Sequence, residues 1–216
     1  MNKKDTILLA ALKLFSRNGF KDTSIAELSR LTGAAEGTIF HHFRNKEDIF
    51  LHILDDARQT ISDEFNRFSR QKVFISGLDM VIQGVSFYLE LAAGMEDQFL
   101  IIQRHYPYKL AETNPDCRKN LEAVYNCVLA FFETAVKRGQ KDGSIREISP
   151  RKAALLLYSL VDGVVRFNTY HLYHGGALYE DLMDVCERML SHTSDTAVEL
   201  TRQWHERRFS GGIERK

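Results

Sequence analysis

Residues 24–46 read SIAELSRLTGAAEGTIFHHFRNK, and this stretch predicts two short helices joined by a tight turn. Ser24 and Glu27 form a capping-box pattern, in which the serine hydroxyl accepts from the amide of Glu27 and the glutamate reaches back to the amide of Ser24. Gly33 ends the first helix, because glycine adopts the left-handed conformation at a helix end at little cost. A second helix follows to about His42, so the stretch has the layout of a helix-turn-helix.

The start of the second helix is short of bulky side chains. It holds Ala34, Ala35, Gly37 and Thr38, so this end of the helix can approach another backbone closely. Free amides at a helix N-terminus also suit an anion such as a phosphate. Lys46 stands at the next predicted helix start, where a cation and free amides suit a second phosphate. These features favour a helix that binds a phosphate backbone.

The run GTIFHHFRNK, from Gly37 to Lys46, matches the block G-T-hydrophobic-aromatic-x-[H/Y]-F-x-x-K. On this block the chain resembles the N-terminal domain of TetR-family transcriptional regulators. The preceding ILLAALKLFSRNGFKDTS, residues 7–24, is similar to the first helix and turn of that family, and the similarity covers about residues 5–52. The resemblance implies a helix-turn-helix DNA-binding domain over residues 1–52 and a helical ligand-binding and dimerisation domain over residues 53–216.

The resemblance also implies which residues bind DNA. Ser24 and Lys46, each at a helix start, would contact phosphates. Residues of the second helix would contact the DNA backbone, its phosphates or the groove. The implied set is Ser24, Ala35, Glu36, Gly37, Thr38, His41, His42 and Lys46.

Two of these residues depart from the family pattern. Ala35 replaces the serine that commonly caps the recognition helix, and Glu36 stands where lysine or arginine is frequent. A carboxylate there repels phosphate but can accept a hydrogen bond from the N4 amine of cytosine in the major groove. We therefore hypothesise that Glu36 reads a C·G base pair.

Outside this stretch the chain predicts helices nearly throughout, because no run alternates polar and apolar residues as strands do. The expected helices cover about residues 7–18, 45–70, 73–91, 96–106, 121–140, 150–173 and 178–190, with a last polar helix to about residue 208. We therefore expect an all-α fold.

The segment 153–173 is apolar on nearly all sides, with Leu155, Leu156, Leu160 and Phe167 among its members. A helix that is hydrophobic all round is buried on two sides. Together with residues 178–190, it resembles the helix pair through which TetR-like proteins form a four-helix dimer interface. We expect a homodimer; the alternative is that this helix is central to one monomer.

Candidates for contact with a small-molecule effector are aromatic side chains and polar side chains on apolar helices, since a buried polar group needs a partner. Asp162 and Arg166 are four residues apart, so we expect them to form an ion pair within their helix. The candidates are Gln103, His105, Asn126, Tyr158, Asp162, Arg166 and Asn168. The sequence does not name the ligand.

Charge gives little support to nucleic-acid binding by itself. The chain holds 29 Lys and Arg against 29 Asp and Glu, and residues 1–52 carry a charge of only +2. One short helix contacts only a few base pairs, so a weakly basic DNA-binding domain needs a second copy, related by two-fold symmetry, to bind a specific site. We therefore expect a palindromic operator, bound by two recognition helices roughly 34–36 Å apart.

Other classes of protein find less support in the sequence. No nucleotide-binding or hydrolase motif is present, so we expect neither an enzyme nor a cofactor. His41, His42 and His52 are an unconvincing metal site, since adjacent helical residues point apart. The three cysteines form no C-x-x-C pair, and the most apolar stretch carries charges, so we expect a soluble, cytoplasmic protein without a membrane span.

The sequence thus predicts a dimeric repressor that a small, largely apolar ligand releases from its operator. Ala35 and Glu36 keep one alternative open, a helical protein-interaction adaptor that has lost DNA binding.

Overall fold

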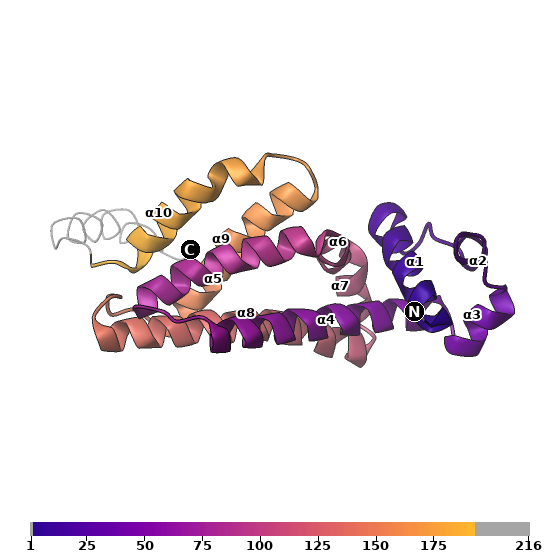
Figure 1. Cartoon of the computed structure of the whole chain (residues 1–216), viewed down its shortest axis with the longest axis horizontal. Coiled ribbons are helices and arrows are strands. Elements are labelled where there is room, and N and C mark those ends of the chain that lie inside the picture. Colours follow the sequence, from indigo (N-terminus) through magenta and orange to yellow (C-terminus); the bar gives the residue numbers. More distant parts are fainter. Residues whose placement is uncertain (1, 193–216) are drawn as a thin grey trace, which may run out of the picture.

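A computed structural model describes residues 2–192, and every regular element in that range is a helix. Figure 1 shows a small head of α1, α2 and α3 at one end of an elongated molecule and a larger helical body at the other. The elements are α1 Lys3–Asn18, α2 Ile25–Thr32, α3 Glu36–His42, α4 Lys46–Gln71, α5 Gly77–Gly94, α6 Glu96–Gln103, α7 His105–Ala111, α8 Pro115–Asp142, α9 Pro150–Thr169, the 3-10 helix η1 Gly175–Leu178 and α10 Tyr179–Leu190. The all-α prediction is confirmed; the predicted helix to about residue 208 lies outside the described residues.

The head is held by a small apolar core to which all three of its helices contribute. Ile7 and Phe15 of α1, Leu28 of α2 and Ile39 of α3 are each almost completely buried. These residues recur at helical spacing, so each short helix turns one face inward. Leu31, by contrast, leaves most of its side chain exposed.

The turn between α2 and α3 follows the predicted chemistry with one difference. Gly33 adopts the left-handed conformation, and the Ser24 hydroxyl accepts from the amide of Glu27 at 3.1 Å. The Glu27 carboxylate accepts from Asn18 Nδ2 at 3.3 Å instead of closing the capping box. The helix-turn-helix prediction is confirmed. Of the two hydrogen bonds expected in the capping box, only the one from the Glu27 amide to Ser24 is present.

α4 runs without a break from the head into the body. The side chain of Asn45 accepts from the amide of Asp48 at 2.8 Å and so starts the helix where predicted. α4 contacts α1 in the head and α8 in the body (Figure 1). The expected domain boundary after residue 52 falls inside this continuous helix.

α8 is the central helix of the body, in contact with α4, α5, α7 and α9. It begins at Pro115, well before the predicted residue 121, because the Asn114 side chain caps it and proline suits its first position. α5 begins at Gly77, later than the predicted residue 73, because Ser76 caps it. Local capping therefore sets both starts.

Two further segments differ from their predicted lengths. Residues 96–106 form two helices, because the backbone of Arg104 is extended between α6 and α7. α9 ends at Thr169 and not near residue 173, and the chain then turns through His171 at a positive φ of 51°. Among the described helices, α9 included, none has the length and apolarity needed to cross a bilayer.

α5 and α8 cross at a very short distance near the far end of the body. A Cβ added to Gly77 would lie 2.0 Å from the backbone nitrogen of Gly139. The start of α5 can therefore touch the backbone of α8 only because Gly77 lacks a side chain. The contact fixes the register in which α5 lies on α8.

We predict that Gly77→Ala lowers the free energy of unfolding by at least about 1–3 kcal/mol, because an added methyl group has no space. Gly94→Ala is the control, since a Cβ at Gly94 meets nothing within 4 Å. Urea unfolding followed by circular dichroism, at one protein concentration, measures both variants. Equal effects of the two substitutions would contradict the close crossing.

Candidate functional site

The start of α3 is exposed and carries little side-chain bulk. Ala35 provides no side-chain cap, as its residue type implies, and Glu36 and Gly37 are exposed. A Cβ built on Gly37 meets nothing within 4 Å, and its φ is not in the left-handed region. Nothing inside the chain therefore requires glycine here, which leaves space for an approaching partner.

Aromatic rings follow on the same short helix. His41 is exposed, His42 is half-buried, and their ring centroids lie 5.3 Å apart in an edge arrangement. Thr38 is half-buried, while Phe40 leaves half of its side chain exposed. Phe40 was not among the predicted site residues, although an exposed aromatic side chain on this helix is a candidate for contact.

Ser24 lies at the start of α2 with its hydroxyl oxygen occupied by the amide of Glu27. A hydroxyl that accepts one hydrogen bond can still donate its own hydrogen. The side chain of Ser24 is exposed. The implied phosphate contact therefore remains compatible with the cap.

Lys46 has partners that the sequence did not suggest. Its ammonium donates to the carbonyl oxygens of Phe20 and Thr23, each at 2.7 Å, and lies 4.4 Å from the centre of the Phe20 ring. Loss of solvent on burial lowers the pKa of Lys46 below its ordinary value, partly offset by Asp22. The ammonium holds the loop between α1 and α2 on the start of α4, so the implied phosphate contact stays a prediction.

Phe20 also joins the head to the body. Its ring stacks on Tyr106 of α7, with centroids 3.9 Å apart and planes 10° apart, and the edge of Phe50 lies 4.9 Å from the same tyrosine. Lys46, Phe20 and Tyr106 thus form a continuous stack from α4 to α7. Stacked and edge-on aromatic pairs of this kind favour one relative orientation of the rings.

A second link joins the end of α1 to the break between α6 and α7. Arg104 donates through Nη2 to the carbonyl oxygens of Ser16 and Arg17. The Ser16 hydroxyl in turn donates to the Asp97 carboxylate of α6 at 2.6 Å. The last carbonyls of a helix lack partners within it, so a guanidinium there is well placed.

In the body, Asp162 of α9 lies in a cluster of polar side chains. Its Oδ1 accepts from Tyr88 at 3.1 Å, Gln103 at 3.2 Å and Tyr158 at 3.4 Å. Arg166 donates instead to the backbone carbonyl of Gln103 at 3.4 Å. The predicted Asp162–Arg166 ion pair is therefore wrong, because donors from α5 and α6 reach the carboxylate while Arg166 faces outward.

The tyrosines around Asp162 stay protonated. Burial raises the pKa of Tyr88 and Tyr158 well above the ordinary value, and Asp162 raises both further. Burial and the hydrogen bond to Tyr108 raise the pKa of Tyr125 as well. Tyr88 and Tyr158 therefore act as neutral donors to the carboxylate, while the Tyr125 hydroxyl pairs with that of Tyr108.

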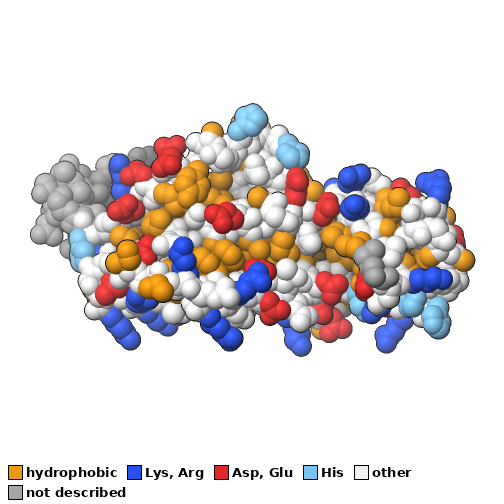
Figure 2. All heavy atoms as spheres, viewed as in Figure 1, with side chains coloured by type: hydrophobic (Ala, Val, Ile, Leu, Met, Phe, Trp, Pro, Cys, Tyr) orange, Lys and Arg blue, Asp and Glu red, His pale blue; other side chains and the backbone are white. Residues whose placement is uncertain are grey.

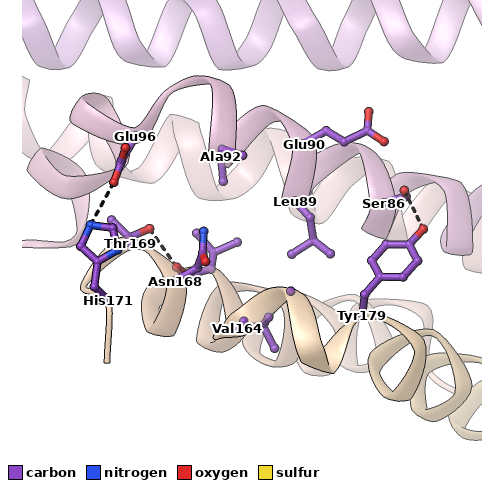
Figure 3. A pocket seen from close by; sticks show the side chains of 14 residues that line it. Ser86, Leu89, Glu90, Ala92, Glu96, Val164, Asn168, Thr169, His171 and Tyr179 are labelled. Carbon is purple, nitrogen blue, oxygen red and sulfur yellow. Dashed lines mark hydrogen bonds and ion pairs between the residues drawn. The ribbon is translucent and has the colours of Figure 1, made fainter. Parts of the chain in front are cut away.

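The remaining predicted ligand residues lie elsewhere. His105 begins α7 and Asn126 lies on α8, both exposed. Asn168 lines a separate cavity of about 520 Å³ between α5, α9 and η1, shown in Figure 3. The structure thus brings together Gln103, Tyr158 and Asp162, with Arg166 at the edge, and leaves the other three apart.

The cavity of Figure 3 has an apolar floor and a polar rim. Leu89 and Val164 face each other across it, Ser86 pairs with Tyr179 at 3.0 Å, and Glu96 lies 3.4 Å from His171. Figure 2 shows apolar side chains gathered over the α10–α5 side of the molecule, with acidic side chains among them. No sequence pattern marks this cavity, because its lining comes from three separate segments.

One face of α9 and α10 is apolar and uncovered. Leu155, Leu156, Leu160 and Phe167 of α9 are between 39% and 53% exposed, and Val185 of α10 is 46% exposed. Ala153, Leu157 and Val161, on the other face of α9, are completely buried in the body. Apolar residues exposed together in this way are typical of an interaction surface.

Neither a metal site nor a reactive thiol stands out. In residues 2–192 no three His, Cys, Asp or Glu side chains come together as a metal ion requires. Burial raises the pKa of Cys117 and Cys186 to about 11, so both thiols stay protonated and unreactive at neutral pH.

Comparison with known proteins agrees with this geometry. The model of the bacterial regulatory proteins of the tetR family matches residues 7–62. The transcriptional repressor BepR of Brucella suis is 30% identical over 167 residues, which are 74% of this chain and 77% of that protein.

Solved structures show the same fold over nearly the whole chain. FadR of Bacillus subtilis, solved with stearoyl-CoA, has a TM-score of 0.67 at 19% identity and covers 84% of this chain and 96% of its own. A protein of Saccharomonospora viridis, solved with choline, has a TM-score of 0.76 at 20% identity. The match covers 88% of this chain and 98% of that protein.

We predict that Lys46→Met lowers the free energy of unfolding of the DNA-free protein by about 1–2 kcal/mol, because two partly buried carbonyls lose their charged donor. Lys21→Met serves as control, since the Lys21 side chain is exposed in the same loop. Urea denaturation without DNA measures the difference. If Lys46→Met is as stable as Lys21→Met, the ammonium does not hold the loop.

Proposed function

The chain belongs to the TetR family of bacterial transcriptional regulators, and from this premise we propose a dimeric repressor that a small, largely apolar ligand releases from a palindromic operator. As a member of this family it is a DNA-binding regulator and not an enzyme. The exposed start of α3 is the observation that carries the proposal. We place the protein in the cytoplasm, the compartment that holds the DNA, and its unpaired cysteines agree with this.

The DNA contact is proposed at the exposed surface of α3 and the start of α2. α3 has seven residues, so it is only about 10 Å long and spans a few base pairs. Gly37 permits a close approach, Glu36 is exposed and has no hydrogen-bond or ion-pair partner among residues 2–192, and Ser24 has a hydroxyl hydrogen to donate. We propose that Ser24, Thr38, His41, His42 and Phe40 line the contact around them.

A second copy of the chain is the proposed partner for the apolar face of α9 and α10. One short helix with a weakly basic head gives little specificity, and two copies double the readout. The exposed leucines of α9 lie on a helix whose other face is already buried. A helix that is apolar on both faces suits a position between two subunits.

The body is the proposed site of the effector. FadR of Bacillus subtilis was solved with stearoyl-CoA, and the Saccharomonospora viridis protein was solved with choline. The described body holds two places with convergent polar groups and apolar walls, the Asp162 cluster and the cavity between α5 and α9. Repression is proposed because BepR, the relative at 30% identity, is a repressor.

The operator is tested by selecting bound molecules from a random-sequence DNA pool at two salt concentrations. We expect an enriched palindrome and a log–log salt slope of about −0.9 for each phosphate contacted. Gly37→Leu is expected to fold normally but to bind the selected DNA at least about tenfold more weakly, because its side chain fills the space of the DNA.

Two results of the selection decide the finer points. If Glu36 reads a C·G base pair, exchanging the C·G pairs of the selected site weakens binding by the unaltered protein. The same exchange should then have no effect on binding by Glu36→Gln. No enrichment by a folded, dimeric protein would contradict the proposed function and favour the adaptor hypothesis.

The dimer is tested with Leu160→Glu, which places a charge on the exposed apolar face of α9. We expect monomers by sedimentation velocity and at least about tenfold weaker binding to the selected operator, because two linked half-sites bind better than one. Gln59→Glu adds the same charge at an exposed position of α4. A dimeric Leu160→Glu variant would contradict the proposed interface.

A further inference from the structure

Asp162 carries a carboxylate that no cation neutralises in the described part of the chain. Its three partners, Tyr88, Gln103 and Tyr158, are neutral donors, and all three converge on Oδ1. Arg166, the nearest candidate in sequence, is turned to the carbonyl of Gln103. Asp162 is half-buried, and a carboxylate shielded from part of the solvent gains more from a positive partner than an exposed one, because the attraction is stronger in a lower dielectric.

Gln103 adds an acceptor that has no partner. Its side chain is almost fully buried, with 5% of the residue exposed, and its Oε1 has no hydrogen bond in the described structure. Nε2 of the same amide donates to Asp162, so Oε1 lies beside the carboxylate group. A buried acceptor without a donor costs free energy, which a ligand that donates would recover.

Aromatic rings surround these two acceptors. The ring of Tyr158 lies 5.9 Å from that of Tyr88 and 5.6 Å from that of Tyr125, both edge-on, and Phe99 lies 5.6 Å from Tyr88. The faces of such rings carry partial negative charge and attract cations. The cluster therefore offers a carboxylate, a free amide oxygen and aromatic faces, all of which favour positive charge.

A surface hollow between α7 and α8 lies one aromatic ring away from this cluster. The hydroxyls of Tyr108 and Tyr125 meet at a surface hollow of about 210 Å³ that both residues line. Tyr125 contacts Tyr158, whose hydroxyl reaches Asp162. Displacement of the exposed Tyr108 on the short helix α7 would open the hollow toward Asp162.

We propose that the effector of this regulator carries a protonated amine, which binds the carboxylate of Asp162 and Oε1 of Gln103 between the rings of Tyr88, Tyr125 and Tyr158. The proposal rests on the proposed function, since it assumes release by an effector. The apolar part of the ligand fills the space that Tyr158 and Tyr108 leave as they move aside. The hydrogen bond from Tyr158 to Asp162 is the longest of the three, at 3.4 Å, and it is the first to break when the ligand binds.

The cavity of Figure 3 is the competing place for such a ligand. Glu90 and Glu96 stand at its rim, but Glu96 already pairs with His171 and Glu90 is exposed to solvent. Their charges are therefore screened by water more than that of Asp162. The two sites are distinguished by removing one acid at a time.

Three probes of matched shape test the proposal on the full-length dimer: 4-phenylbutylamine, 4-phenylbutanol and 4-phenylbutyrate. Isothermal titration calorimetry gives each Kd, and release of the selected operator is measured separately. We expect the amine to bind at least about tenfold more tightly than the alcohol, and the carboxylate most weakly. Asp162→Asn should abolish this preference, and Gln103→Met should reduce it.

Asp63→Asn is the matched control, because this acid is exposed on α4, away from the cluster. Circular dichroism and operator binding establish that each variant folds. Equal affinities for amine and alcohol, or no binding of either by a protein that binds its operator, would overturn the amine proposal and leave the proposed function standing. Loss of the preference in Glu90→Gln but not in Asp162→Asn would overturn it too. A protein that binds no selected DNA would instead overturn the proposed function, whatever the probes do.

Discussion

The contact between the end of α1 and the break between α6 and α7 is the constraint on which the geometry of this molecule depends. Arg104 binds the last carbonyls of α1, and Tyr106, two residues on, stacks on Phe20 beside Lys46. Beside the continuous helix α4, these contacts and the packing of α1 on α6 give the head a second connection to the body, which restrains how the two turn relative to one another. The break thus sets where α3 points.

The same break lies beside the polar cluster of the body. Gln103 reaches Asp162 through its side chain, while Arg104, the next residue, reaches Ser16 of α1. A ligand that binds the side chain of Gln103 acts on backbone that also positions Arg104. This is a contiguous physical connection between the proposed effector site and the DNA-binding head, of the kind that can carry allosteric coupling. Coupling further needs two states that the ligand binds differently.

Much of the fold was predictable from short stretches of sequence, and the errors have local causes. Gly33 ends α2 through its left-handed backbone and Asn45 starts α4 through its side-chain cap, both local effects, so α2, α3 and α4 lie where expected. The start of α8 was missed because Pro115 marks both a break and a first helical position, and the cap Asn114 decides between them. The split of 96–106 was missed because Arg104 leaves the helix to bind α1, a partner far away in sequence.

The sequence by itself determined the all-α fold, the helix-turn-helix and the family, since caps, glycines and the block from Gly37 to Lys46 act over a few residues. Tertiary structure alone decided where the charged groups go. Lys46 turns to carbonyls of the loop after α1, and Asp162 turns to donors on α5 and α6 in place of Arg166. Spacing along one helix cannot show this, because a buried charge takes its partners from whichever elements pack around it, and packing joins residues that are distant in the chain.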